Sequence, residues 1–181
     1  MSTNTSIALT NMYDYYNNNK LNFVWLDLPA TDEEIENAIK QLNITTITEG
    51  DGFFVSDTST DLEVEGDFLH ASNMVELKEI NEIIKNIDDM NEYELEEFNA
   101  ILQYTGSNYF QEALDIFEKG DYCYYGEVSN LYHLGEQAVE NGYIDVPDDL
   151  VNYIDYEAVG RDIDYSNSGG FTRNGYIEIY A

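Results

Sequence analysis

Hydrophobic and polar residues alternate along this chain in two ways, one typical of strands and one typical of amphipathic helices. Residues 1–60 contain four short apolar runs with the length and composition of strands. These runs are Ile7–Leu9, Phe23–Leu28, Ile44–Ile47 and Phe53–Val55. A turn is expected at Asn17–Asn19, and Thr31 with Glu34 forms the capping box of a helix before the third run. We therefore expect a small antiparallel sheet that carries one helix.

The apolar spacing changes to three and four residues in residues 61–120, which predicts a helical domain. An acidic stretch at Asp61–Asp67 is the expected linker into it. Asn73 caps the first predicted helix, a second begins at Asn91, and a third runs from about Asn108 to Gly120, where glycine suits a left-handed cap. The apolar residues expected to face inward on the first two helices are Leu77, Ile80, Ile84, Ile87, Leu95, Phe98 and Leu102.

Residues 121–181 mix both patterns again. Tyr122–Tyr125 predicts a strand, and Ser129 is expected to cap a helix that ends at Gly142. Pro147 suits the first turn of a further helix carrying Leu150, Tyr153 and Ile154, and Arg173–Gly175 predicts a hairpin turn near the end. The fold class we expect is α+β, with three small domains at residues 1–60, 61–120 and 121–181.

The net charge of the chain is the first feature that bears on its function. The sequence holds 37 Asp and Glu against 7 Lys and Arg, a formal net charge of −30. Its 43% of hydrophobic and 14% of aromatic residues exclude a disordered acidic chain. The three predicted domains hold 9, 16 and 12 acids in turn, so the charge is not confined to a tail. Nucleic acid and anionic membranes would repel this protein, and its expected partner is positively charged.

On the central helices the acids fall opposite the apolar stripes, with Glu92, Glu96 and Glu97 expected to point outward. We expect the following acids to form a surface that imitates DNA: Glu76, Glu79, Glu82, Asp88, Asp89, Glu92, Glu96, Glu97, Glu112 and Asp115. The net charge of −30, spread at the density of duplex DNA (one charge per ~1.7 Å of axis), would cover ~50 Å. That length is on the scale of a DNA-binding groove.

Catalytic and metal-binding patterns are weak. Asp162, Asp164 and Ser166 match the first ligands of a calcium loop, but the twelfth position is Arg173 in place of Glu. His70 and His133 lack partners at metal-ligand spacing. Cys123 is the single cysteine, which excludes an internal disulfide and favours a reducing cytoplasm. With no signal peptide or membrane span in the sequence either, we expect a cytoplasmic protein that is not an enzyme and binds no cofactor or metal.

Both ends of the chain resemble one known family. Leu150–Asp164 resembles the C-terminal signature of the ArdA antirestriction proteins, an N-Y-I-D-Y-x-A-x-G-R-D run followed by a hydrophobic residue. Tyr16–Asn18 and Val24–Leu28 resemble the family's Y-N-x-G…G-x-W-L-D-L start, from which this chain departs by having Asn19 and no glycine before its Trp.

The resemblance implies an elongated, acidic, dimeric mimic of bent B-form DNA. Such proteins occupy the DNA groove of type I restriction-modification enzymes, at the specificity and methyltransferase core, and inhibit them stoichiometrically in the bacterial host cell. They are carried by phages, plasmids and conjugative transposons. The C-terminal part supplies the dimer contact in this family, so the resemblance assigns Tyr153, Ile154, Tyr156 and Arg161 a structural or dimer role. For Arg161 we expect a buried ion pair with a nearby carboxylate.

Two other interpretations stay open at this point. The same acidity would serve a DNA mimic aimed at another target, such as Cas9 or a nucleoid protein. It would also serve an acidic adaptor or chaperone for a basic protein.

Overall fold

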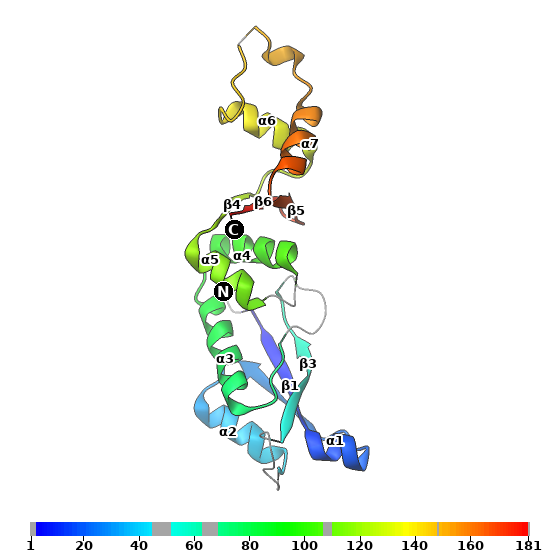
Figure 1. Ribbon diagram of the computed structural model, residues 1–181. Coiled ribbons are helices and arrows are strands. Elements are labelled where there is room, and N and C mark those ends of the chain that lie inside the picture. Colours follow the sequence, from blue (N-terminus) through cyan, green and yellow to red (C-terminus); the bar gives the residue numbers. More distant parts are fainter. Residues whose placement is uncertain (1–2, 45–51, 63–68, 107–109, 148, 181) are drawn as a thin grey trace. The chain divides into compact units, whose positions relative to one another are not determined.

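The computed structural model describes residues 3–44, 52–62, 69–106, 110–147 and 149–180 (Figure 1). Seven α-helices and two three-stranded antiparallel sheets lie within these residues, which confirms a mixed α+β fold. The chain divides into two compact units, residues 1–95 and 96–181, with the boundary inside helix α4 (Glu92–Thr105). The finer division into three domains, and the elongated shape, stay predictions.

The first unit is built on a sheet with the strand order β2-β1-β3. Strand β1 (Thr5–Asn11) lies in the centre and pairs antiparallel with β2 (Phe23–Leu28) and β3 (Phe53–Ser59). One face of this sheet is apolar and buried, and its residues include Ile7, Leu9, Leu26, Leu28 and Phe53. Helices α2 (Asp32–Gln41) and α3 (Met74–Asp88) contact β2 and bring their own apolar stripes to the core (Figure 1).

The helix caps of the first unit follow the sequence closely. Thr31 and Glu34 form the predicted capping box of α2, and the Asn73 side chain accepts hydrogen bonds from the first turn of α3. Asn81 of α3 exchanges two hydrogen bonds with the backbone of Ala30, at 2.6 and 2.9 Å. This pair fixes α3 against the segment that leads into α2, because the backbone donor and acceptor of one residue, Ala30, are both satisfied by one amide side chain.

The connection between β1 and β2 differs from the predicted turn. Residues Met12–Asn18 form a short helix, α1, whose N-cap Asn11 accepts a hydrogen bond from the backbone N–H of Asp14. The helix ends at Asn19 in the left-handed conformation, with a φ of 47°, so an asparagine stands where glycine is commonest. Most of the predicted strand at Ile44–Ile47 and most of the Asp61–Asp67 linker lie outside the described residues.

The second unit joins a helical pair to a small sheet. Helices α4 (Glu92–Thr105) and α5 (Phe110–Lys119) share an aromatic core, in which the ring of Phe98 meets those of Phe110 and Phe117 edge to face at 5.7 and 5.9 Å. Gly120 follows α5 with a φ of 70°, as predicted. The sheet has the order β4-β6-β5, formed by Tyr122–Tyr125, Tyr176–Ile179 and Gly169–Phe171. The predicted hairpin turn at Arg173–Gly175 joins β5 to β6.

Two helix starts in this unit were predicted at the wrong residue. Helix α6 (Leu131–Glu140) is capped by Asn130 in place of Ser129. The helix expected from Pro147 is reduced to a single 3₁₀ turn at Val151–Tyr153. The longer helix α7 (Tyr156–Ser166) begins after it, because the Asp155 side chain accepts a hydrogen bond from the N–H of Ala158.

Helices α6 and α7 lie against each other through two glycines (Figure 1). A Cβ atom on Gly160 would collide with the backbone carbonyl of Leu131, and one on Gly135 would collide with that of Tyr156. The two helices therefore touch backbone to backbone. Gly160 is the glycine of the C-terminal signature, and this contact gives its physical reason.

We expect Gly160→Ala to destabilise the second unit by about 3 kcal/mol, because backbone atoms cannot move aside as a flexible side chain would. The midpoint of thermal unfolding, followed by circular dichroism, should fall by roughly 10 °C. Tyr165→Ala on the same helix is the control: Tyr165 is 94% exposed, and its removal should leave the midpoint nearly unchanged. Equal midpoints for the two variants would contradict the close helix contact.

Candidate functional site

The negative charge is shared by the two units. Residues 1–95 hold 20 acids and 4 bases, and residues 96–181 hold 17 acids and 3 bases. The ion pairs of the described residues join Lys40 to Glu36, Lys78 to Asp32, Lys85 to Glu82 and Arg161 to Glu157. Every side chain in these pairs is more than half exposed, so the pairs are screened by solvent and hold little of the fold together.

The predicted acids of the first unit lie on α3 and at the start of α4. Glu79, Asp89 and Glu92 are exposed to solvent, as is Glu82, whose carboxylate lies 3.6 Å from the Lys85 ammonium. These four side chains can face a partner without first breaking a structural hydrogen bond that the structure shows. They are the part of the predicted surface that is free to bind.

Two further predicted acids of this unit are tied into the fold. A Glu76 carboxylate oxygen accepts hydrogen bonds from the backbone N–H and hydroxyl of Ser72, at 2.7 and 3.0 Å. These bonds, the backbone one first, hold the pKa of Glu76 below its usual value. Asp88 accepts from both the backbone N–H and the hydroxyl of Thr3, at 2.8 Å each, which anchors the start of the chain to the end of α3.

The second unit carries the other four predicted acids, and here the expected orientation is partly wrong. Glu112 is exposed, and Asp115 accepts a hydrogen bond from the side chain of Gln111 at 2.9 Å. Glu96 and Glu97, expected to point outward, are half-buried. Glu97 accepts from the Tyr122 hydroxyl at 2.7 Å and Glu96 from the Tyr124 hydroxyl at 3.2 Å. They join α4 to β4, a tertiary contact that helical periodicity does not report.

Two acidic contacts of the first unit were not predicted. Glu94 accepts from the backbone N–H of Asn91 at 2.9 Å and completes a capping box at α4, a signal that the spacing of Asn91 and Glu94 carries. Asp32 lies 2.8 Å from Lys78, so α2 and α3 are joined by an ion pair. This pair lowers the pKa of Asp32 and raises that of Lys78. No local pattern in the sequence reveals it.

Of the four signature residues, Tyr156 and Arg161 lie in α7, whereas Tyr153 and Ile154 precede it. Tyr153 is 83% exposed, Ile154 and Tyr156 are half-buried, and the ring of Tyr156 meets that of Tyr132 at 5.3 Å. Arg161 bonds Glu157 one turn away at 3.1 Å, but both side chains are exposed. The expectation of a buried ion pair at Arg161 is therefore wrong, since α7 turns this face to solvent.

The remaining candidate sites do not assemble. Asp162, Asp164 and Ser166 lie within α7, so they cannot form the loop that calcium coordination requires. Among the described residues, no three His, Cys, Asp or Glu side chains are grouped so that they could hold a metal ion. No helix in the described ranges is long and apolar enough to cross a membrane.

A folded chain whose two units each carry a large excess of acids, many of them exposed on helices, fits the class of proteins that imitate DNA. Comparison with protein families gives the same answer: the family described as antirestriction protein (ArdA) matches residues 10–178. The chain therefore belongs to the ArdA family of antirestriction proteins. These proteins are DNA mimics that inhibit type I restriction-modification enzymes, and they are inhibitors without catalytic activity. A comparison with curated proteins gave no match.

The two neighbouring acids at the end of α3 should differ in their effect on stability. We expect Asp88→Ala to lower the free energy of unfolding of the first unit by about 2 kcal/mol, because two donors of Thr3 lose a charged acceptor. Asp89→Ala is the matched control and should be neutral or slightly stabilising, since it removes a negative charge from a helix C-terminus. Urea unfolding of both variants measures the difference, and equal losses would exclude an anchoring role for Asp88.

Proposed function

We propose that the exposed acids of the predicted surface lie in the DNA-binding groove of a type I restriction-modification enzyme, at its specificity and methyltransferase core; these acids are Glu79, Glu82, Asp89, Glu92 and Glu112. The observation that carries this proposal is the exposure of Glu79, Asp89, Glu92 and Glu112 on helices, in a family of DNA mimics. Carboxylates on helices stand in for phosphates, because both are anions held at fixed spacings along a rigid support. The bacterial cytoplasm, where such enzymes work, is the compartment we propose.

The hydrogen-bonded acids support the same surface in a different way. Glu76, Glu96 and Glu97 accept hydrogen bonds from neutral donors, so these bonds fix their positions without pairing them with a cation. A fixed anion loses less conformational entropy on binding than a free one. The full set of ten predicted acids therefore combines exposed contact residues with fixed contributors to the field.

Binding through this surface should release counterions from both partners, as DNA binding does. The affinity should then fall linearly with the logarithm of salt concentration, with a slope that counts the charges in contact. The inhibition is stoichiometric, since the protein occupies the groove and nothing is turned over.

We also propose that the chain forms a homodimer through its C-terminal signature. Tyr153 and Leu150 are 83% and 54% exposed within a short stretch of this signature. Large apolar side chains that are exposed close together usually mark a surface that binds another molecule. A dimer would also double the length of duplex that the acids can imitate.

Neutralising the five exposed acids together should abolish inhibition. A single substitution should have little effect, because the electrostatic attraction is spread over many carboxylates. The variant carries Glu79→Gln, Glu82→Gln, Asp89→Asn, Glu92→Gln and Glu112→Gln. Competition with DNA for a purified type I methyltransferase should show a loss of affinity and a salt slope reduced by about 4 to 5.

The control neutralises five other exposed acids: Glu33, Glu36, Glu118, Glu127 and Glu140. It has the same net charge, so it separates a particular surface from general acidity. Equal losses in the two variants would show that only the net charge matters and that the assigned residues are wrong.

The dimer has its own test in sedimentation equilibrium. Tyr153→Ala should shift the protein from dimer to monomer at micromolar concentration, because a buried aromatic anchor at an interface contributes about 2 kcal/mol or more. Tyr13→Ala, which removes a tyrosine that is 60% exposed in the first unit, should leave the mass unchanged. A Tyr153→Ala dimer as tight as the original would place the interface elsewhere.

A further inference from the structure

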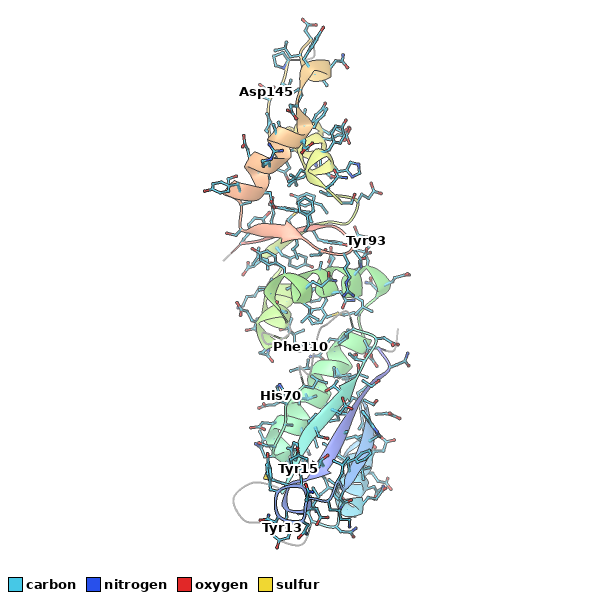
Figure 2. All side chains as sticks on the ribbon, turned by 90° about the vertical axis from the view of Figure 1, so that its right-hand side faces the viewer. Tyr13, Tyr15, His70, Tyr93, Phe110 and Asp145 are labelled. Atoms are coloured by element: carbon cyan, nitrogen blue, oxygen red, sulfur yellow. The ribbon has the colours of Figure 1, made fainter. Side chains whose placement is uncertain are left out.

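An aromatic hollow of about 370 Å³ lies on the sheet of the first unit, on the face opposite to its buried core. Ala8 in the central strand forms its floor. Its walls come from β2, β3 and the α1 connection, and the side chains that matter here are Tyr15, Leu21, Phe23, Trp25, Phe54 and Asp57. Figure 2 labels Tyr13 and Tyr15 on the α1 segment beside this sheet.

The strand pairing explains why the surface is concave. Trp25 of β2 and Asp57 of β3 pair with Ala8 from opposite sides, and Phe23 and Phe54 pair with Thr10 in the same way. Small side chains in the central strand therefore lie between large ones on both edge strands. Because directly paired side chains share one face of a sheet, this arrangement leaves a trough along β1.

The large apolar side chains that form the walls of the hollow are exposed to solvent and not buried in the core. Phe23, Trp25 and Tyr15 are 44%, 45% and 45% exposed, and Leu21 is 63% exposed. Tyr15 and Phe54 fix one wall, with their rings edge to face at 5.4 Å. A cluster of exposed aromatic side chains on a sheet whose other face packs on the core is typical of a binding surface.

The negative charges around the hollow favour a positively charged group as its ligand. Asp57 lines it, and Asp27 is exposed on the same face of β2, two residues beyond Trp25. A second copy of the chain would bring its own Asp27 and Asp57 against these two, within a protein of charge −30, and nucleic acid would bring phosphates. Only a cationic occupant gains from both the rings and the carboxylates.

We propose that the aromatic hollow receives an arginine side chain from a basic surface of the inhibited restriction enzyme, outside the contacts made by the acidic helices. The proposal rests on the function proposed above and names a second, chemically different contact for it. A guanidinium is flat and weakly hydrated, so it stacks on the Trp25 indole while it pairs with Asp57. A phosphate backbone offers no such contact, and this part of the surface does not imitate DNA.

The two contacts respond differently to salt, and this difference makes the proposal testable. Attraction between the acidic helices and a groove weakens steeply as salt rises, because it depends on counterion release. Burial of aromatic surface is not screened. Loss of the hollow should therefore weaken binding by a similar factor at every salt concentration, whereas loss of the acids should change the slope.

The experiment measures binding of the full chain to a purified type I methyltransferase between 50 and about 300 mM salt. The variant Phe23→Thr/Trp25→Thr keeps residues that favour strands and removes two exposed rings, so the sheet should stay folded. We expect affinity to fall about 30-fold with an unchanged slope, the effect of losing one interface hot spot. Tyr165→Thr, which removes a fully exposed ring in the second unit, is the control and should bind within a factor of two or so.

A direct readout accompanies the affinities. Trp25 is the single tryptophan of the chain, so replacing it with 5-fluorotryptophan gives one ¹⁹F resonance, which should shift when the methyltransferase binds. An unshifted resonance together with unchanged affinity of the double variant would overturn the proposal while the salt slope still upheld groove binding. No binding of the unaltered chain at any salt concentration would overturn the proposed function itself. A double variant that loses self-association would assign the hollow to a second copy and overturn the arginine assignment.

Discussion

Mutual repulsion among carboxylates is the constraint on which the rest of this structure depends. With 37 acids and 7 bases, the chain cannot neutralise its charge by ion pairs, and the four described pairs are all exposed. The fold instead supplies neutral hydrogen-bond donors to its carboxylates. Three capping glutamates, Glu34, Glu76 and Glu94, accept from backbone N–H groups at helix starts, where the helix dipole also favours a negative charge.

Several of the neutral donors are asparagine amides and tyrosine hydroxyls. Asp14 accepts from the amides of Asn18 and Asn22, which lower its pKa, and Glu96 and Glu97 accept from tyrosine hydroxyls. A lysine in these places would hold the carboxylate equally well but would cancel its charge. Asparagine and tyrosine, of which the chain has 19 and 16, stabilise the anion and leave the field intact. The same bonds that hold the fold together therefore preserve the charge that the family uses to imitate DNA.

Structural features that depend on residues close together in the chain can be predicted from the sequence. Features that depend on residues far apart in the chain cannot. Thr31, Asn73 and Gly120 act as predicted because a cap involves residues only a few positions apart. The inward turn of Glu96 and Glu97 depends on tyrosines some 25 residues away, and no helical period contains that information. Gly160 could be recognised as part of a signature, but its purpose needs the backbone of Leu131 beside it. Phe23 and Trp25 lie in a predicted strand, yet only the pairing of Trp25 with Ala8 and of Phe23 with Thr10 shows that they frame a hollow.

Acidity alone gives little specificity for one partner, because a protein with a net charge of −30 attracts any basic surface. Complementary charge raises the rate of encounter and rejects anionic partners, but discrimination among cationic ones needs contacts of a different kind. The proposed arginine contact at the aromatic hollow would be of this kind, since it needs a guanidinium at one position on the partner and not a general excess of charge. In the proposed function, the acidic helices of both units would bring the protein to a DNA-binding groove, and the aromatic hollow on the first sheet would determine which enzyme it binds tightly.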